Sequence, residues 1–309
     1  MSTITSAYTE ALAASKLVAG SQNCPQSTLY VVATPIGNLA DISLRALYLL
    51  GLADTIACED TRHTGQLLHA YGLHKPLMAL HEHNESEAAQ NVIAKLHTGE
   101  RVVYVSDAGT PAISDPGSRL VAAAVAAGLR VVPLPGASSV TTLLSAAGCV
   151  NTSGFVFIGF LPSKGADRAA VFKQVECAER AVVVLEAPHR IETLLKELSS
   201  LGERRVTVGR ELTKQFESIV TMQAAELPAW LAAKADNARG EFSLVVHPKA
   251  IQDIASSGAD STITTTATAL LTRLLQDLPL KTAVQVAMDV SGLPKNSLYD
   301  QALKLKDAS

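Results

Sequence analysis

The sequence predicts an α/β protein of two domains followed by a small helical extension. Three observations carry this prediction. Strand-like and helix-like segments alternate through the first half, and several of those strands run into loops rich in Gly, Pro, Ser and Thr. A polar break near residue 151 then separates them from a second group of longer strands. Such alternation predicts a mainly parallel sheet with helices on both faces.

In the first half, buried strands are expected where short apolar runs end in turn residues, and helices where apolar residues recur at helical spacing. The expected strands are residues 29–33, 55–58, 77–80, 102–106 and 131–134. The expected helices are residues 43–50, 65–71, 86–97, 118–127 and 139–146.

The second half predicts a separate and mixed sheet, because its strands are longer and are joined by hairpin-like loops. Its expected strands are residues 155–160, 181–186, 205–208 and 242–247, with helices at 168–178 and 191–198. Short helices are expected at 267–278, 281–291 and 297–305. The resulting organisation is a flexible tail (1–27), an N-terminal α/β domain (28–150), a C-terminal α/β domain (151–250), a linker (251–266) and a helical extension (267–309).

Composition favours a folded protein with ordinary surface charge. The chain has 309 residues, is 48% hydrophobic and carries a formal net charge of -3, so bulk charge gives no support for nucleic-acid binding and leaves only a local basic patch open. Its four cysteines form no C-x-x-C pair, which argues against a zinc cage or a disulfide framework. The start lacks the features of a secretory signal, and no apolar run is long enough to span a membrane. We expect a cytoplasmic protein without a membrane partner.

Three loops of the first half suggest a small-molecule site. They follow expected strands at residues 34–39, 107–111 and 135–139. Open α/β sheets bind ligands at such carboxyl ends of strands. Asp107 can accept hydrogen bonds from a ribose or an amine, and Gly37 and Gly109 allow the backbone to approach a ligand. Each loop alone is also typical of an ordinary turn, but three at successive strand ends favour a site.

Charged residues follow another strand at Glu59, Asp60 and Arg62. The two acids fit either a helix N-cap with first-turn charges or a contact to a substrate hydroxyl, and both remain open. His81 and His83 resemble metal ligands, but they would point to opposite faces of a strand. We therefore predict a polar loop there and assign no metal.

Two similar motifs occur in the second half, at residues 186–190 (EAPHR) and 209–214 (GRELTK). In the first, Pro188 would stop the strand and start a helix, and Glu186 and Arg190 fit a structural ion pair. Each motif alone is more typical of structure than of catalysis.

Taken in order, these segments resemble the tetrapyrrole methylase superfamily, the class III S-adenosylmethionine-dependent methyltransferases. The resemblance covers roughly residues 28–250. It rests on residues 33–42 (ATPIGNLADI), 59–62 (EDTR), 81–84 (HEHN), 106–111 (SDAGTP), 159–162 (GFLP), 186–190 (EAPHR) and 209–214 (GRELTK). Asp-Ala-Gly-Thr-Pro replaces the usual Gly-Asp-Pro turn of tetrapyrrole enzymes, which indicates a subfamily that acts on ribosomal RNA. Residues 280–305 resemble that subfamily's helical extension.

The resemblance implies a homodimer of two-domain protomers that bind S-adenosyl-L-methionine in the cleft between domains. It implies cofactor contacts from the first domain at Pro35, Gly37, Asp107, Ala108, Gly109, Thr110, Ala112, Ser138 and Ser139. From the second domain it implies contacts at Phe160, Leu161, Ala187, Pro188 and Gly240. Asn38-Leu39 stands where the usual glycine loop has a further Gly-Asp, so the role of Asn38 stays open.

The implied activity is 2′-O-methylation of a cytidine ribose in the decoding region of 16S rRNA, with free rRNA or the small ribosomal subunit as the partner. The candidate catalytic residues are Glu59 and Asp60, as base or hydroxyl contact, and Lys214, for the developing oxyanion. The candidate RNA-binding residues are Arg62, Arg190, Arg210, Lys295 and Lys304. The alternatives are methylation of a tetrapyrrole carbon and a non-catalytic RNA-binding role.

Overall fold

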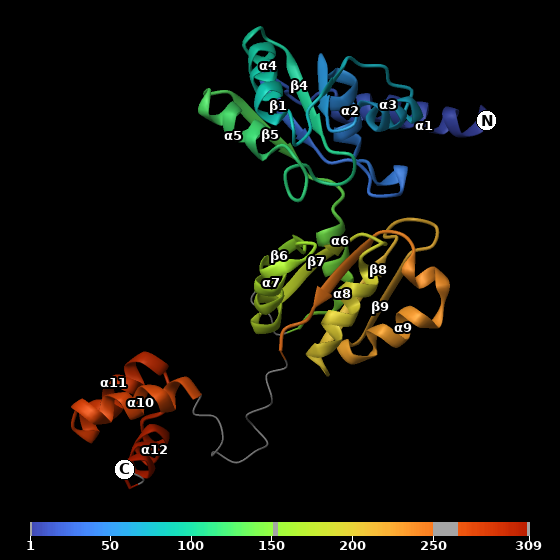
Figure 1. Ribbon diagram of the computed structural model, residues 1–309. Helices are drawn as coiled ribbons and strands as arrows, with labels where there is room; N and C mark the ends of the chain where they lie inside the picture. Colours follow the sequence, from blue (N-terminus) through green and yellow to red (C-terminus); the bar gives the residue numbers. More distant parts are fainter. Residues whose placement is uncertain (1, 151–153, 250–264, 308–309) are drawn as a thin grey trace. The chain divides into compact units, whose positions relative to one another are not determined.

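The computed structural model describes residues 2–150, 154–249 and 265–307. The chain forms two compact units, Met1–Lys249 and Ala250–Ser309. The first unit contains two five-stranded sheets, and the second is helical where it is described (Figure 1). This agrees with the α/β class and the helical extension expected from the sequence.

The first sheet is entirely parallel, with strand order β3-β2-β4-β1-β5. Its strands are β1 (Thr28–Val32), β2 (Thr55–Cys58), β3 (Leu77–Ala79), β4 (Arg101–Val105) and β5 (Arg130–Leu134). They lie within one or two residues of the expected ranges. All five carboxyl ends therefore reach the same edge, where the Gly- and Pro-rich loops begin.

Helices cover both faces of this sheet. Alternate strand residues point to opposite sides, so the apolar strands present side chains for burial on each face. On one face, apolar residues such as Tyr30 and Val103 pack against α2 (Leu44–Leu52) and α3 (Thr61–Ala70). On the other, Leu29 and Val102 pack against α4 (Glu85–His97) and α5 (Ser118–Ala126). Burial on both faces explains the continuous apolar runs of the three central strands β2, β4 and β1.

The amino-terminal segment differs from the expected flexible tail. It forms α1 (Ser2–Ala19), which packs against α2. Ser15 and Ala19 are buried, and Ala11 and Leu12 contact the core of the first sheet. The Ser-, Thr- and Ala-rich composition that suggested a loose tail instead permits close packing between the two helices.

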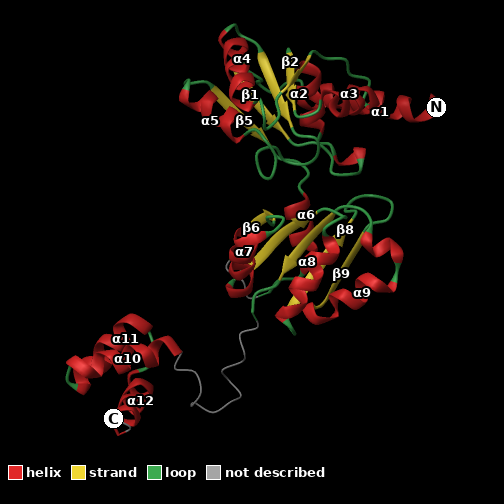
Figure 2. Ribbon diagram, viewed as in Figure 1, coloured by secondary structure: helices red, strands yellow, loops and turns green. Residues whose placement is uncertain are grey.

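The second sheet is mixed, as expected, with order β6-β7-β10-β8-β9. Only β6 and β7 are parallel to each other (Figure 2). Its strands are β6 (Phe155–Phe160), β7 (Ala181–Glu186), β8 (Arg205–Arg210), β9 (Ser218–Gln223) and β10 (Phe242–Val246). One face is covered by α7 (Gly165–Cys177), α8 (Ile191–Leu198) and α9 (Leu227–Ala233). The sequence patterns did not indicate β9 and α9, a half-exposed edge strand and a short helix.

Helix α6 (Ser139–Ala147) covers the opposite face of the second sheet, although it precedes the polar break near residue 151. Its residues Val140 and Leu143 pack with Val183 and Val245 of that sheet. The expected domain boundary at 150 therefore assigns α6 to the wrong sheet. The chain changes sheets earlier, in the loop between β5 and α6.

The C-terminal unit contains α10 (Thr265–Asp277), α11 (Leu280–Ser291) and α12 (Lys295–Asp307). They enclose a small core that includes Leu271, Val284 and Leu298. Gly292, in the left-handed conformation, ends α11, and Pro294 precedes α12. The expected linker lies mostly outside the described residues. No helix in the described ranges is long and apolar enough to cross a membrane.

Glu85 is a buried acid that belongs to α4 but caps α5. Its Oε1 accepts hydrogen bonds from the backbone N–H groups of Gly117 (2.9 Å), Arg119 (2.9 Å) and Leu120 (3.4 Å). No side chain within α5 itself performs this role. A carboxylate at a helix N-terminus also interacts favourably with the helix dipole. Glu85 thus fixes the end of the segment that follows β4.

We predict that Glu85→Ala lowers the free energy of unfolding by about 1–3 kcal/mol, because it leaves buried N–H groups without an acceptor. Glu85→Gln keeps an acceptor oxygen and should lose less. Glu87→Ala, on the exposed side of the same first turn, is the control. Urea unfolding compares the three variants, and equal losses in all of them would refute the capping role.

Candidate active site

A cavity lies at the carboxyl edge of the first sheet. The chain leaves β2 toward β3 and leaves β4 toward β5, in opposite directions from two adjacent strands. Ligands bind outside the strand ends at such a switch point. The cavity has a volume of about 340 Å³. Its lining residues are Ile36, Glu59, Asp107, Ala108, Gly109, Thr110, Ile113, Ser114, Asp115, Ser138, Ser139, Val140, Phe157, Phe160, Leu185, Leu212, Glu241 and Ser243.

The loops after β1 and β4 are joined by a two-hydrogen-bond bridge. The N–H of Thr34 donates to the carbonyl of Gly109 (2.9 Å), and the N–H of Gly109 donates to the carbonyl of Thr34 (3.0 Å). Gly109 has a φ of 78°, which side chains rarely allow. The hydroxyl of Thr110 donates to the carbonyl of Ala137 (3.0 Å), which adds the loop after β5. The three loops therefore form one hydrogen-bonded floor.

Three carboxylates line the cavity: Glu59, which follows β2, and Asp107 and Asp115, which follow β4. Burial raises the pKa of Glu59, and the nearby charges of Asp107 and Asp115 raise it further. Burial likewise raises the pKa of Asp115, against a hydrogen bond from Ser106, and the charge of Asp107 adds to the rise. A raised pKa makes Glu59 a better proton acceptor than an exposed glutamate.

Asp60 is the N-cap of α3. Its Oδ1 accepts from the N–H groups of Arg62 (2.7 Å) and His63 (3.4 Å), and its Oδ2 pairs with the Arg62 guanidinium (2.8 Å). These bonds to Arg62 hold the pKa of Asp60 well below its usual range. Asp60 donates its own N–H to Asp107 Oδ1 (3.1 Å) and does not line the cavity. Of the two interpretations that the sequence leaves open, the geometry favours the cap.

The wall from the second sheet includes the connection between β8 and β9, residues 211–217. Lys214 Nζ lies 2.9 Å from Glu211 Oε1 and 3.1 Å from Glu241 Oε2. Burial alone would lower the pKa of Lys214, but the bonds to Glu211 and Glu241 raise it overall. A Cβ at Gly37 would collide with the Lys214 side chain and with Thr213 Oγ1. Gly37 is therefore needed for close packing of the two loops.

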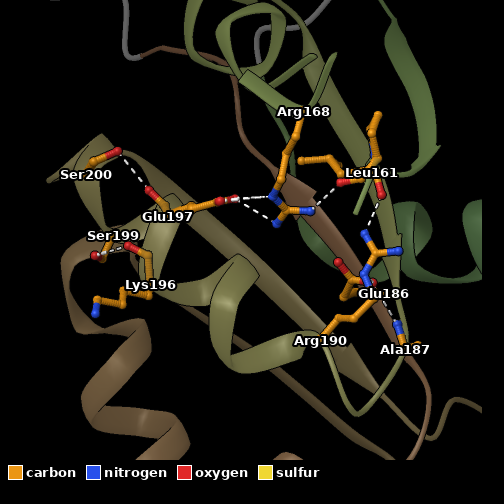
Figure 3. Close-up of polar contacts among 10 residues, drawn as sticks. Leu161, Arg168, Glu186, Ala187, Arg190, Lys196, Glu197, Ser199 and Ser200 are labelled. Carbon is orange, nitrogen blue, oxygen red and sulfur yellow. Dashed lines mark hydrogen bonds and ion pairs between the residues drawn. The ribbon is translucent and has the colours of Figure 1, made fainter. Parts of the chain in front are cut away.

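Two guanidinium groups hold the loop after β6 (Figure 3). Arg190 pairs with buried Glu186 at 3.1 Å and donates to the carbonyl of Leu161. Arg168 pairs with Glu197 at 2.7 Å and donates to the carbonyl of Pro162 at 2.8 Å. These contacts fix the backbone next to Phe160, whose exposed ring lines the cavity.

The cavity brings together seven of the expected cofactor contacts: Asp107, Ala108, Gly109, Thr110, Ser138, Ser139 and Phe160. Seven others do not line it: Pro35, Gly37, Ala112, Leu161, Ala187, Pro188 and Gly240. Gly240 packs against the Glu211 side chain, and Leu161 is buried. The cavity also recruits Ile113, Ser114 and Asp115, which directly follow the SDAGTP motif, and Leu212, Glu241 and Ser243 from the second sheet.

The expected RNA contacts have different surroundings. The Arg62 side chain is 86% exposed beside Asp60, whereas Arg190 is paired with Glu186. Arg210 donates to the carbonyl of Phe216 at 3.0 Å and stabilises the β8–β9 connection. Lys295 and Lys304 are exposed on α12 of the C-terminal unit. Arg62, although it pairs with Asp60, and these two lysines are thus the more exposed cations of the set.

Comparison with known proteins identifies the class. Residues 28–228 match the family model of the Tetrapyrrole (Corrin/Porphyrin) Methylases. The fold is shared with cobalt precorrin-4 methyltransferase, a cobalamin biosynthetic enzyme, at a TM-score of 0.55 and 17% identity over 72% of this chain and 95% of that one. Diphthine synthase has a TM-score of 0.54 at 16% identity, over 71% of this chain and 90% of that one. The chain is a member of the tetrapyrrole methylase family.

Closer relatives define the branch of this family. The chain is 45% identical over 285 residues to ribosomal RNA small subunit methyltransferase I of Pseudomonas aeruginosa, covering 91% of this chain and 99% of the relative. It is 44% identical over 281 residues to the enzyme of that name from Neisseria meningitidis serogroup B, covering 91% and 94%. Residues 261–306 match the RsmI C-terminal HTH domain. The chain belongs to the ribosomal RNA small subunit methyltransferase I family.

The raised pKa of Glu59 predicts that the stability difference between wild type and Glu59→Gln depends on pH. Because the pKa of Glu59 is raised in the folded state, folding is favoured while Glu59 is protonated, and this contribution is lost as pH rises from its usual pKa through the raised value. We predict that Glu59→Gln increases Tm above that window and has little effect below it. Exposed Glu82→Gln is the control. A Tm difference that does not change with pH would contradict the prediction.

Proposed function

We propose that this protein uses S-adenosyl-L-methionine to methylate the 2′-hydroxyl of a cytidine in the decoding region of 16S rRNA, acting as a homodimer on rRNA or on the small ribosomal subunit. The observation that carries the proposal is the cavity at the switch point of the parallel sheet, in a chain that belongs to a family of rRNA methyltransferases. The site residues named below are part of the same proposal.

The cavity suits the cofactor in size and chemistry. Its volume of about 340 Å³ falls within the range of small-molecule sites. Asp107 would accept hydrogen bonds from hydroxyl or ammonium groups, and Ser138 and Ser139 would offer further polar contacts. Ile36, Phe160 and Leu212 would cover an adenine ring. When bound, S-adenosyl-L-methionine supplies a methyl group on a positively charged sulfur.

The chain's part in the chemistry is alignment and proton transfer. We assign Glu59 as the group that would hold the ribose hydroxyl and accept its proton. Lys214 faces two carboxylates, so we assign it chiefly to positioning Glu241 and the loop around Leu212, with stabilisation of the developing oxyanion as a secondary role. Asp60 would act indirectly, by orienting Asp107 and α3.

The deciding experiment is transfer of labelled methyl groups to 16S rRNA, presented both free and as assembled small subunits. We expect incorporation at one ribose, mapped by primer extension at low nucleotide concentration. Incorporation into a tetrapyrrole instead would favour the alternative activity. Cofactor binding by calorimetry without any transfer would favour a non-catalytic relative.

Two isosteric variants separate the neighbouring acids. Glu59→Gln should reduce single-turnover transfer by roughly 10²-fold or more and abolish the acidic limb of the pH–rate profile, while cofactor affinity is kept. That limb should lie above the usual glutamate pKa, because the pKa of Glu59 is raised. Asp60→Asn preserves a good N-cap residue and should retain most transfer. The reverse pattern would make Asp60 the base.

For the homodimer, light scattering at micromolar concentration should give about twice the chain mass of 32.4 kDa. A monomer throughout the concentration range would rule out a substrate surface shared between subunits.

A further inference from the structure

An exposed aromatic side chain stands on the connection between β8 and β9. Phe216 is 69% exposed, two residues before β9 begins at Ser218. The strands on either side are paired up to their last residues, Arg210 with Ser218, so the connection is a closed hairpin loop of residues 211–217. The Phe216 side chain is more exposed than those of Phe155 (47%) and Phe160 (52%), the other exposed phenylalanines of the described residues.

The loop that carries Phe216 is held rigidly. Glu211 and Thr213 have φ values of 52° and 67°, which residues other than glycine rarely adopt. Such conformations persist where surrounding contacts enforce them, and they concentrate at functional sites. Here the Thr213 N–H donates to the Glu217 carboxylate at 2.6 Å, and the Arg210 guanidinium donates to the Phe216 carbonyl at 3.0 Å. The ring is therefore presented by a fixed backbone.

The same loop forms part of the cavity. Leu212 lines the cavity four residues before Phe216, and Lys214 anchors the loop to Glu241, another lining residue. The close packing of Gly37 against Lys214 joins this loop to the floor after β1. Phe216 is thus tied, through a short and rigid segment, to the place where the methyl group would be transferred.

Two arginine side chains, those of Arg210 and Arg239, lie on the segments next to the loop that carries Phe216. Arg210 reaches the carbonyls of both Phe216 and Arg239, so its guanidinium lies between the loop and the segment before β10. The Arg239 side chain is largely exposed, with only an exposed contact to Asp236. Exposed aromatic rings and guanidinium groups on neighbouring segments are a combination that binds unpaired nucleotides, by stacking on the base and attraction to the phosphate.

We propose that Phe216 stacks on an unpaired base of the RNA substrate and so holds the target nucleotide at the cavity. The proposal rests on the proposed function, since it deepens how the same site recognises RNA. An enzyme that acts on one nucleotide must separate it from its stacked neighbours, and a fixed aromatic ring compensates for the lost stacking. Phe216 then contributes to RNA binding and not to cofactor binding.

The test measures methyl transfer to small subunits, or to free 16S rRNA if only that is active, with wild type and Phe216→Ala, →Leu and →Trp. Phe216→Ala should raise KM for RNA roughly tenfold or more with unchanged cofactor affinity. Phe216→Trp should keep the wild-type KM, and Phe216→Leu should resemble alanine, because leucine cannot stack. Phe155→Ala removes another exposed phenyl ring, on strand β6 at the opposite edge of the sheet, and serves as the control.

Fluorescence and light scattering distinguish base stacking from a role of the ring in dimerisation. In Phe216→Trp, fluorescence of the introduced indole should be quenched by a single-stranded RNA oligonucleotide of mixed sequence. Rescue by leucine, or an unchanged KM in Phe216→Ala, would overturn stacking. A shift of Phe216→Ala to half the wild-type mass in light scattering would assign the ring to a subunit interface instead. Absence of transfer by wild type itself would refute the proposed function and not this residue's role alone.

Discussion

The site depends on one steric constraint, the absence of room for a side chain at Gly37. The loop after β1 lies so close to residues 212–214 that even a methyl group would collide with Lys214. This contact joins the floor built by the first sheet to the wall built by the second. It acts together with the bridge between Thr34 and Gly109, which holds the floor, and with the packing of Leu212 against α6, which holds the wall.

Much of the fold could be predicted from sequence because its signals are local. Buried parallel strands are apolar throughout, and their ends are marked by Gly, Pro and Asp, so all five strands of the first sheet can be located within a residue or two. The elements that the sequence did not predict also have physical reasons. Strand β9 is a partly exposed edge with no clean alternation, and α1 gains its order only by packing against α2. Tertiary contacts of that kind leave no local signature.

Part of the cavity lining could also be predicted from the sequence. Asp107 and its neighbours, at strand ends, line the cavity as expected, because topology alone brings such ends together. The close approach expected at Gly37 is observed toward Lys214, and its contact with a cofactor stays a prediction. For Asp60 and Arg190 the sequence left a structural role and a functional role open, and the structure places them in a helix cap and in an ion pair with buried Glu186. Sequence shows which residues are charged, and geometry decides what those charges are paired with.

The placement of α6 limits how the chain can be divided. Its apolar side belongs to the second sheet, and Ser138 and Ser139 at its start belong to the cavity. A fragment ending at the polar break would leave Val140 and Leu143 without the second-sheet residues that bury them. The fragment after the break would expose the face of the second sheet that α6 covers. The crossover between the sheets therefore coincides with the binding site, so the halves cannot be exchanged between relatives as independent modules. Any rotation of one half about this crossover would also change the shape of the cavity.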